Sequence, residues 1–549
     1  MPGRLHGMPG DGQPREDSAM FLALCGCILL TIAISVLPGR ADEPKPGGVL
    51  KIYHRDSPAS ASIHEEATYS TVIPFMPVFN NLVIFNQHVP QNSEETIVPD
   101  LATSWSWNED KTKLTFRLRE GVKWHDGKPF TSKDVQCTWD LLMGKAKDSF
   151  RKNPRQGWYF NVAEVSANGD YEISFNLKRP QPALLSLLAS GYSPVYPCHV
   201  SARDMRLKPI GTGPFKFVEF KQNESMKVVR NPDYWRQGRP FLDAIEFTVV
   251  PNRSTAILAF VAGRFDMTFP AEVTPPLMRD IKSQAPQAVC QMVPTNVSIN
   301  LIVNRDAAPF NNPDLRRAMA LALDRKAFVD ILTEGQAQIG GAMLPPPEGV
   351  WGMPKEMLAT LPGYGPDAQK NRAEARKIME TLGYGRDNRL SVKISTRNVS
   401  VYRDPAVILI DQLKGVYIDG VLDVIETSNW HAKITRKDYL VGLNLTGNAV
   451  DDPDQNFYEN YACGSERNVT DYCNKDLQKL FDQQSSETDR EKRKKLAWEI
   501  DHKLQEDMAR PIIFHQRAGT CWSPRVKDLT LMVNSFYNGW RFEDVWLDH

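Results

Sequence analysis

The stretch from Leu114 to Val135, LTFRLREGVKWHDGKPFTSKDV, holds the signals of a strand, a tight turn and a helix start. Lys113 to Leu118 alternates apolar and polar residues, which is the period of a half-buried strand. Asp126-Gly127 is a tight-turn dipeptide. Thr131, followed three residues later by Asp134, forms the hydroxyl-and-acid pattern that opens a helix. The stretch therefore predicts strand, turn and helix in succession, with architectural roles for its residues.

The chain on both sides of this stretch mixes strand and helix patterns. Further strands are predicted at Val49 to Tyr53, Tyr171 to Leu177 and Ala244 to Val250. Helix starts and stops predict helices opening at Asn312-Pro313 and covering Arg325 to Glu334, Asn371 to Leu382 and Asp489 to Ala509. Gly211 and Gly213 suggest unusual backbone angles at a chain reversal. The fold class is α/β or α+β, in more than one lobe.

Composition and charge exclude several classes of protein. The chain has 549 residues, 42% of them hydrophobic and 24% charged, which is enough for large cores and unlike a disordered chain. Lys plus Arg and Asp plus Glu are both 66, so the formal net charge is zero. Because nucleic-acid binders usually carry a basic excess, no nucleic-acid partner is expected.

The N-terminal segment reads as an export signal. The apolar run Met20 to Leu37 follows Arg4 and Arg15 and precedes Gly39 and Ala41 at A-x-A-like spacing. Residues 1–41 are therefore predicted to be a signal peptide, which makes the mature chain periplasmic. An uncleaved membrane anchor is the alternative, and Met20 is an alternative start.

Six cysteines remain after that signal: Cys137, Cys198, Cys290, Cys463, Cys473 and Cys521. An even number in an exported protein permits disulfides, although sequence does not fix their connectivity. Cys463 and Cys473 are the predicted local pair, because they close a short polar loop. Buried free thiols are the alternative for all six.

The search for catalytic motifs is negative. Gly121 to Pro129 superficially resembles a phosphate loop, but five residues separate its first and second glycines and Pro129 replaces the hydroxyl that magnesium needs. Asp452, Asp454 and Asn456 imitate the opening of a calcium loop that then lacks its turn glycine. No zinc-protease or hydrolase-elbow motif occurs, and the histidines lack clustered spacing. We expect no catalytic residues, no metal and no cofactor; a secreted hydrolase is the alternative from another class.

Several stretches flank Leu114–Val135 in a fixed order: Gly47 to Ile52, Pro99 to Ala102 with Ser104-Trp105, Gly211 to Phe217, Arg230 to Trp235, and Phe310 through Arg316-Arg317-Ala318 to Arg325. Together they strongly resemble the family 5 extracellular solute-binding proteins, which are the oligopeptide, dipeptide and nickel receptors of ABC-type importers. The resemblance covers nearly the whole mature chain.

The resemblance implies a two-lobed periplasmic binding protein of type II, similar to the large cluster C, that closes on its ligand by a hinge. Lobe I would comprise residues 42–303 plus 514–549, and lobe II residues 304–513. The apolar extended segments Asn300 to Asn304 and Arg510 to Phe514 suit the crossings between lobes.

Ligand-binding residues follow from the same resemblance. Dipeptide receptors of the family pair the ligand carboxylate with an arginine after a lobe II strand. Counting back from Leu413 to Ile418, which resembles the family's helix-end motif, places Arg397 there, with Arg403 as a nearby substitute. A surface arginine is the alternative.

The second ligand position departs from the family. Peptide receptors place an aspartate four residues before a proline to hold the ligand's α-amine. The proline matches Pro453, but the position of the aspartate is Ala449 in this chain, with Asn448 beside it. A tryptophan that commonly lies just upstream is replaced by Thr446. Asp451 or Asp452 could substitute or could cap the next helix. Arg397, Arg403, Asn448 and Asp451 are thus the predicted ligand-binding residues.

The resulting hypothesis is a substrate-binding protein that delivers a short peptide or a related carboxylate-bearing solute to an ABC permease. The permease and ATPase would be separate chains, and the binding protein itself is expected to be a monomer. A receptor for nickel or a metal complex is the alternative within the family.

Overall fold

The central stretch folds as its pattern predicts. In the computed structural model, which describes residues 43–146 and 153–549, β5 spans Lys113–Leu118 and α2 spans Ser132–Leu142. Between them Gly127 adopts φ +88°, and its N–H donates to the carbonyl of Trp124 at 2.8 Å. Thr131 and Asp134 form the predicted capping box. The predicted signal, residues 1–41, lies outside the described residues.

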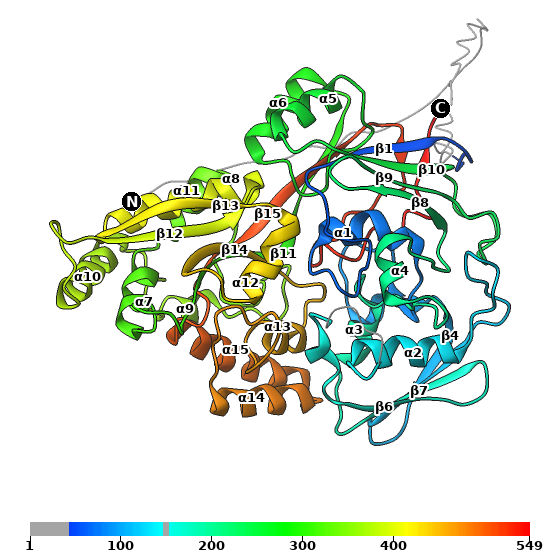
Figure 1. Ribbon diagram of the computed structural model, residues 1–549, viewed down its shortest axis with the longest axis horizontal. Helices are drawn as coiled ribbons and strands as arrows, with labels where there is room; N and C mark the ends of the chain where they lie inside the picture. Colours follow the sequence, from blue (N-terminus) through cyan, green and yellow to red (C-terminus); the bar gives the residue numbers. More distant parts are fainter. Residues whose placement is uncertain (1–42, 147–152) are drawn as a thin grey trace, which may run out of the picture. The chain divides into compact units, whose positions relative to one another are not determined.

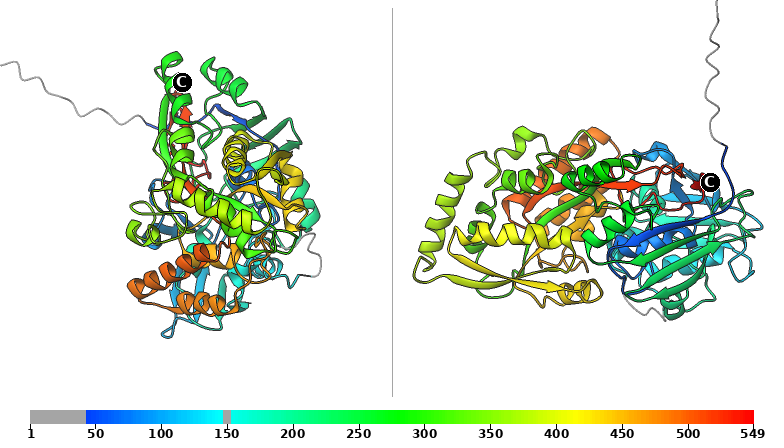
Figure 2. Two further views of the ribbon diagram at one scale, coloured as in Figure 1. Left: turned by 90° about the vertical axis from the view of Figure 1, so that its left-hand side faces the viewer. Right: turned by 90° about the horizontal axis from the view of Figure 1, so that it is seen from above.

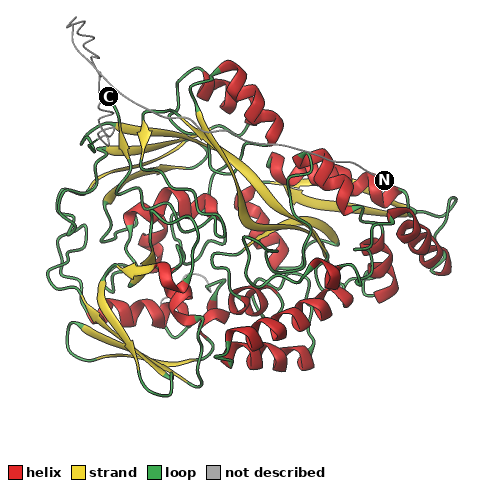
Figure 3. Ribbon diagram, turned by 180° about the vertical axis from the view of Figure 1, so that it is seen from behind, coloured by secondary structure: helices red, strands yellow, loops and turns green. Residues whose placement is uncertain are grey.

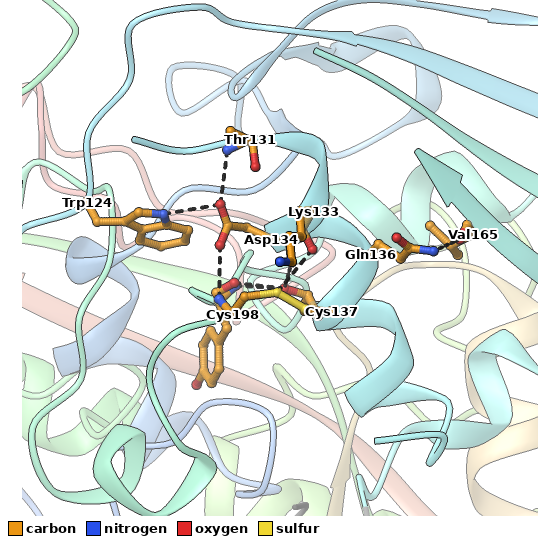
Figure 4. Close-up of a disulfide and its surroundings, with 10 residues drawn as sticks. Trp124, Thr131, Lys133, Asp134, Gln136, Cys137, Val165 and Cys198 are labelled. Atoms are coloured by element: carbon orange, nitrogen blue, oxygen red, sulfur yellow. Dashed lines mark hydrogen bonds between the residues drawn. A yellow bond between two sulfur atoms is a disulfide. The ribbon is translucent and has the colours of Figure 1, made fainter. Parts of the chain in front are cut away.

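Asp134 ties this stretch together (Figure 4). Its carboxylate accepts the backbone N–H of Thr131 at 3.0 Å and the indole N–H of Trp124 at 3.3 Å, and it also accepts the backbone N–H of Cys198 at 2.9 Å. Cys198 forms a disulfide with Cys137 of α2. These residues bond to one another, in agreement with an architectural role.

The strands form three main sheets (Figure 1). One has the order β1-β10-β9-β8 and contains Val49–His54, Ala244–Val249, Ser225–Arg230 and Phe215–Lys221. A second has the order β4-β5-β7-β6, in which β5 is joined by Ala102–Trp107, Glu172–Leu177 and Val162–Ala167. The third has the order β13-β12-β14-β11-β15 and contains Ile418–Ile425, Leu390–Arg397, Val441–Gly447, Val289–Val303 and Ile512–Trp522. Two small sheets pair β2 (Val83–Phe85) with β3 (Ile97–Pro99) and β16 (Val526–Lys527) with β17 (Trp546–Leu547).

Helices surround these sheets (Figure 3). Besides α2, those before β11 are α1 (Tyr69–Phe75), α3 (Leu184–Ala189), α4 (Ala202–Leu207), α5 (Arg253–Val261) and α6 (Pro275–Gln284). Those between β11 and β15 are α7 (Pro313–Leu321), α8 (Arg325–Thr333), α9 (Lys355–Leu358), α10 (Ala368–Thr381), α11 (Ser400–Lys414), α12 (Thr427–Thr435), α13 (Pro453–Asn460), α14 (Lys475–Ser486) and α15 (Arg490–Glu506). The predicted start of α10 at Asn371 was wrong, because Asp367 caps the helix by accepting the N–H of Lys370.

Two long strands, β11 and β15, run antiparallel to each other (Figure 2). Both strands pass from one hydrophobic core to another. On β11, Val293 packs in the first core and Val297 in the second; on β15, Phe514 packs in the second and Ala518 in the first. The pairing register shifts between Pro294 and Ser298. The change of core on β11 therefore coincides with the irregularity in the ladder.

Gly211 and Gly213 correct one expectation. Neither adopts a positive φ, so the predicted unusual backbone angles are absent at both positions. A Cβ on Gly211 would instead lie 1.8 Å from the carbonyl oxygen of Val78, and one on Gly213 would lie 2.5 Å from the backbone nitrogen of Phe79. The glycines are needed because two backbone segments approach too closely for any side chain.

Candidate functional site

Charged side chains from two distant segments meet at the carboxyl ends of strands. Arg397 ends β12, and His54, which ends β1, is followed by Arg55 and Asp56. Nη2 of Arg397 donates to Oδ2 of Asp56 at 2.6 Å. In open α/β sheets this edge of the strands is where ligands commonly bind.

Most of the N–H groups of Arg397 donate to internal partners. It is 1% exposed, and besides Asp56 it donates to the hydroxyl of Tyr402 at 2.8 Å and to that of Thr427 at 2.9 Å. The structure gives this arginine an internal carboxylate as its partner, and its pairing with a ligand carboxylate stays a prediction.

Asp56 is equally well satisfied. Oδ2 also accepts the hydroxyl of Thr427 at 2.7 Å, and Oδ1 accepts that of Ser70 at 2.7 Å. Burial alone would raise the pKa of Asp56, but the charges of Arg397 and Arg55 hold this pKa well below its ordinary value. Asp56 is therefore an anion in the folded protein.

Arg55 presents a different picture. It is 3% exposed, and Nη1 donates to Glu272 at 3.2 Å, yet Nε and Nη2 have no hydrogen-bond partner. Its guanidinium carbon lies 4.6 Å from the ring centroid of Tyr69 and 5.4 Å from that of Phe269. Arg55 is thus a buried cation, and one edge of its guanidinium lacks a hydrogen-bond partner.

Tyrosines and two more arginines continue this group. The ring centroids of Tyr192 and Tyr537 lie 5.0 Å apart, and Arg155 stacks on Tyr192 with its guanidinium carbon 3.8 Å from the centroid. Burial raises the pKa of Tyr192 and of Tyr537, so both hydroxyls keep their protons and can donate. We call the whole set the arginine–tyrosine cluster: Arg55, Asp56, Tyr69, Arg155, Tyr192, Glu272, Arg397, Tyr402, Glu459, Arg467 and Tyr537.

Cations outnumber anions in this cluster. Arg55, Arg155, Arg397 and Arg467 face only three carboxylates, those of Asp56, Glu272 and Glu459. Adding the charged neighbours Arg206, Arg436, Arg510, Glu65, Glu66 and Glu466, most of which line the adjoining cavity, leaves the excess at one guanidinium. Because an unbalanced buried charge is costly, the cluster favours a ligand with one negative charge.

A cavity of about 430 Å³ adjoins the cluster. The chain before β11 contributes Ala67 and Pro154 to its wall, and the chain after β11 contributes His431, Arg467 and Arg510. Nε2 of His431 and Nε of Arg510 lack hydrogen-bond partners. Burial keeps the pKa of His431 well below its ordinary value, so the ring is neutral. The size of the cavity and its wall of apolar surface with a few polar groups suit a small solute.

The other predicted ligand-binding residues are dispersed. Arg403 is exposed on α11 and makes only long hydrogen bonds, at 3.4 Å, to Asn398 and Ser400. Asn448 is 2% exposed and follows β14, and its Oδ1 has no partner. Ala449 is fully buried in the first hydrophobic core.

Asp451 and Asp452 lie on a second cavity, of about 390 Å³, which includes neither Arg397 nor Asn448 in its wall. Oδ2 of Asp451 accepts the N–H of Val350 at 3.0 Å, and burial raises the pKa of Asp451 to about 7. Asp452 caps α13 and pairs with Arg493 at 2.6 Å. The structure thus gives Asp452 the capping role and does not bring Asp451 to Arg397.

Sequence reasoning missed Arg55, Asp56 and the tyrosines. The charged triplet His54-Arg55-Asp56 directly after the first strand was a usable signal, because charges at a strand end lie where ligands bind. Nothing in sequence spacing links it to Tyr192 or Tyr537, since those contacts depend on tertiary packing alone.

The profile of the bacterial extracellular solute-binding proteins, family 5 (middle region), matches residues 96–468. The chain belongs to this family. Di/tripeptide-binding protein 1 of Pseudomonas aeruginosa (strain UCBPP-PA14) is 24% identical over 521 residues, covering 88% of this chain and 92% of that protein. This confirms the family resemblance.

Solved structures show the same two-lobed fold. The oligopeptide-binding protein AppA from Bacillus subtilis, in complex with a nonapeptide, superposes with a TM-score of 0.80 at 22% identity, covering 92% of this chain and 100% of AppA. AgaA from A. tumefaciens R10, in complex with agropinic acid, gives a TM-score of 0.77 at 21% identity, covering 91% and 99%. Within residues 43–146 and 153–549, no helix combines the length and the apolar composition needed to cross a membrane.

Proposed function

We propose that this chain is the substrate-binding protein of an ABC importer and captures a short peptide or another small carboxylate-bearing solute between its lobes. One observation carries the proposal: a buried cluster with one more guanidinium than carboxylates lies beside a cavity walled by both parts of the chain. Such a cluster is completed by a ligand that brings one carboxylate.

The ligand class follows from the relatives and from the residue at position 449. AppA in its complex holds a nonapeptide, and AgaA holds agropinic acid, so relatives of this fold accept peptides and non-peptide acids. Ala449 is fully buried among apolar residues, where the peptide receptors have an aspartate for the ligand amine. A ligand carboxylate is therefore better supported than a free α-amine.

The lobes proposed are residues 42–303 plus 514–549 and residues 304–513, with β11 and β15 as the crossings. The core changes between Val293 and Val297 on β11 and between Phe514 and Ala518 on β15, which supports crossings on these two strands, a few residues away from the bounds proposed. Closure would bury the solute, and a permease and an ATPase on separate chains would receive it and drive transport. The exported location proposed rests on the apolar run Met20 to Leu37, and a receptor for a nickel complex is the alternative.

Native mass spectrometry of protein purified without denaturation tests the proposal. We expect a mass excess of one small molecule, which is lost after unfolding and refolding. The released compound should contain a carboxylate and should rebind to the refolded protein. Conversion of that compound by the isolated chain, or refolded protein that binds no small acid or peptide, would contradict the function proposed.

A further inference from the structure

The partnerless edge of Arg55 is the feature that the proposed function leaves unexplained. Nε and Nη2 point along one side of the guanidinium, and both are buried without a hydrogen-bond partner. Buried polar groups in native proteins are nearly always hydrogen-bonded. Nε with Nη2 is also the fork that grips a carboxylate with two parallel hydrogen bonds.

The neighbouring acids do not fill this edge. Glu272 meets Nη1, on the other side of the guanidinium, at 3.2 Å. Oδ1 of Asp56 is 3.8 Å from Nε, beyond hydrogen-bond reach, and Asp56 is already satisfied by Arg397, Thr427 and Ser70. The faces of the guanidinium are covered by the rings of Tyr69 and Phe269. Only the fork lacks a hydrogen-bond partner.

We propose that Arg55 receives the ligand carboxylate on its Nε–Nη2 edge, while Asp56 keeps Arg397 out of ligand contact. This inference rests on the proposed function and names the group that recognises the solute. It transfers the carboxylate-binding role from the residue predicted by family resemblance to a residue at the end of β1. The solute class is a small monoanionic carboxylate, and the hydroxyls of Tyr69 and Tyr402, which act electrostatically on Arg55, lie nearby.

Arginine side-chain NMR tests this assignment directly. Ligand-stripped protein labelled with ¹⁵N-arginine is titrated with acetate and N-acetylglycine, and with their uncharged counterparts acetamide and N-acetylglycinamide. The Nε–H resonance of Arg55 is identified by its loss in R55K. We expect the two carboxylates to shift this resonance and raise Tm, and the two amides to do neither.

R55K should weaken carboxylate binding by roughly tenfold or more, because lysine keeps the charge but lacks the fork. R325K is the matched control: Arg325 is 5% exposed and stacks on Tyr364 at 3.8 Å, and it donates to the carbonyls of Ile512 and Gly363. R325K should bind the carboxylates like the wild type. If R55K does not fold, R55Q/E272Q replaces it, since both members of that pair are then neutral.

Carboxylates that bind while the Arg55 resonance stays fixed, or that bind R55K as tightly as the wild type, would overturn the assignment. So would a wild-type protein that binds neither carboxylate. In each of these cases a co-purified solute in the native mass spectrum would still support solute capture, so the two proposals fail separately.

Discussion

Arg397 and Asp56 are 341 positions apart in the sequence, yet Nη2 of Arg397 donates to Oδ2 of Asp56 at 2.6 Å. Arg397 ends β12, whereas Asp56 follows β1 in a different sheet. Both side chains are buried. The pair therefore fixes one strand end against the other.

Removing the charge of Asp56 should destabilise the protein. D56N leaves Arg397 buried without its anionic partner, and losing one charge of a buried pair costs about 3–5 kcal/mol. We expect that decrease in the free energy of unfolding, measured by urea titration at pH 7. The double variant D56N/R397Q should lose less than the sum of the single variants.

The control for this cycle is D404N. Asp404 pairs with Arg253 at 3.0 Å and likewise joins residues on either side of β11, but it is far more exposed. We expect D404N to cost less than about 1 kcal/mol. Equal decreases in the free energy of unfolding for D56N and D404N would show that the buried Asp56–Arg397 pair stabilises the protein no more than the exposed pair does.

Two of the disulfides in the described part of the chain should differ in their effect on stability. Cys290–Cys521 joins β11 to β15 across 231 positions of sequence, whereas Cys463–Cys473 spans only 10. In the loop-closure model, removing the long link costs about 5 kcal/mol and removing the short one about 3 kcal/mol. Chemical unfolding of C290A/C521A and C463A/C473A measures both, and a larger loss for the short loop would contradict the prediction.

Asp451 should make stability fall as the pH rises. Burial raises the pKa of Asp451 from 3.8 to about 7, so the folded state holds its proton in a range where the unfolded state has released it. The resulting loss of stability is complete above pH 7 and absent below pH 3.8. D451N should therefore raise the free energy of unfolding by about 1–3 kcal/mol at pH 8 and by less at pH 5. A difference that is independent of pH would rule out titration of Asp451 as the cause.

Much of the fold could be predicted because its signals are local. The capping box at Thr131, the Asn312-Pro313 helix start and the Cys463–Cys473 loop each depend on residues within one turn or loop, and the structure contains all three. The partner of Cys290 lies on another strand, so its identity depended on the register of β11 against β15.

The candidate site was less predictable for the same reason. Arg397 could be placed by counting along a family pattern, but its partner Asp56 comes from a segment that only tertiary packing brings near. The open edge of Arg55 is a property of hydrogen bonds that are missing, which no sequence pattern reports. Gly211 is a similar case. Its sequence context predicted an unusual backbone angle, whereas the structure shows a close approach to the backbone at Val78, which depends on tertiary packing.

That close approach gives the last prediction. A Cβ on Gly211 would lie 1.8 Å from the carbonyl oxygen of Val78, and backbone atoms cannot move aside as a flexible side chain can. G211A should therefore lower the free energy of unfolding by more than about 3 kcal/mol, beyond the range of ordinary substitutions. The matched control is G365A: a Cβ on Gly365 meets nothing within 4 Å, and this glycine has no positive φ. Because alanine also restricts the unfolded chain, G365A should be neutral or stabilising by up to about 1 kcal/mol. Thermal and urea unfolding of both variants test this prediction. A G211A protein as stable as G365A would contradict it and would mean that the backbone near Val78 moves aside without loss of stability.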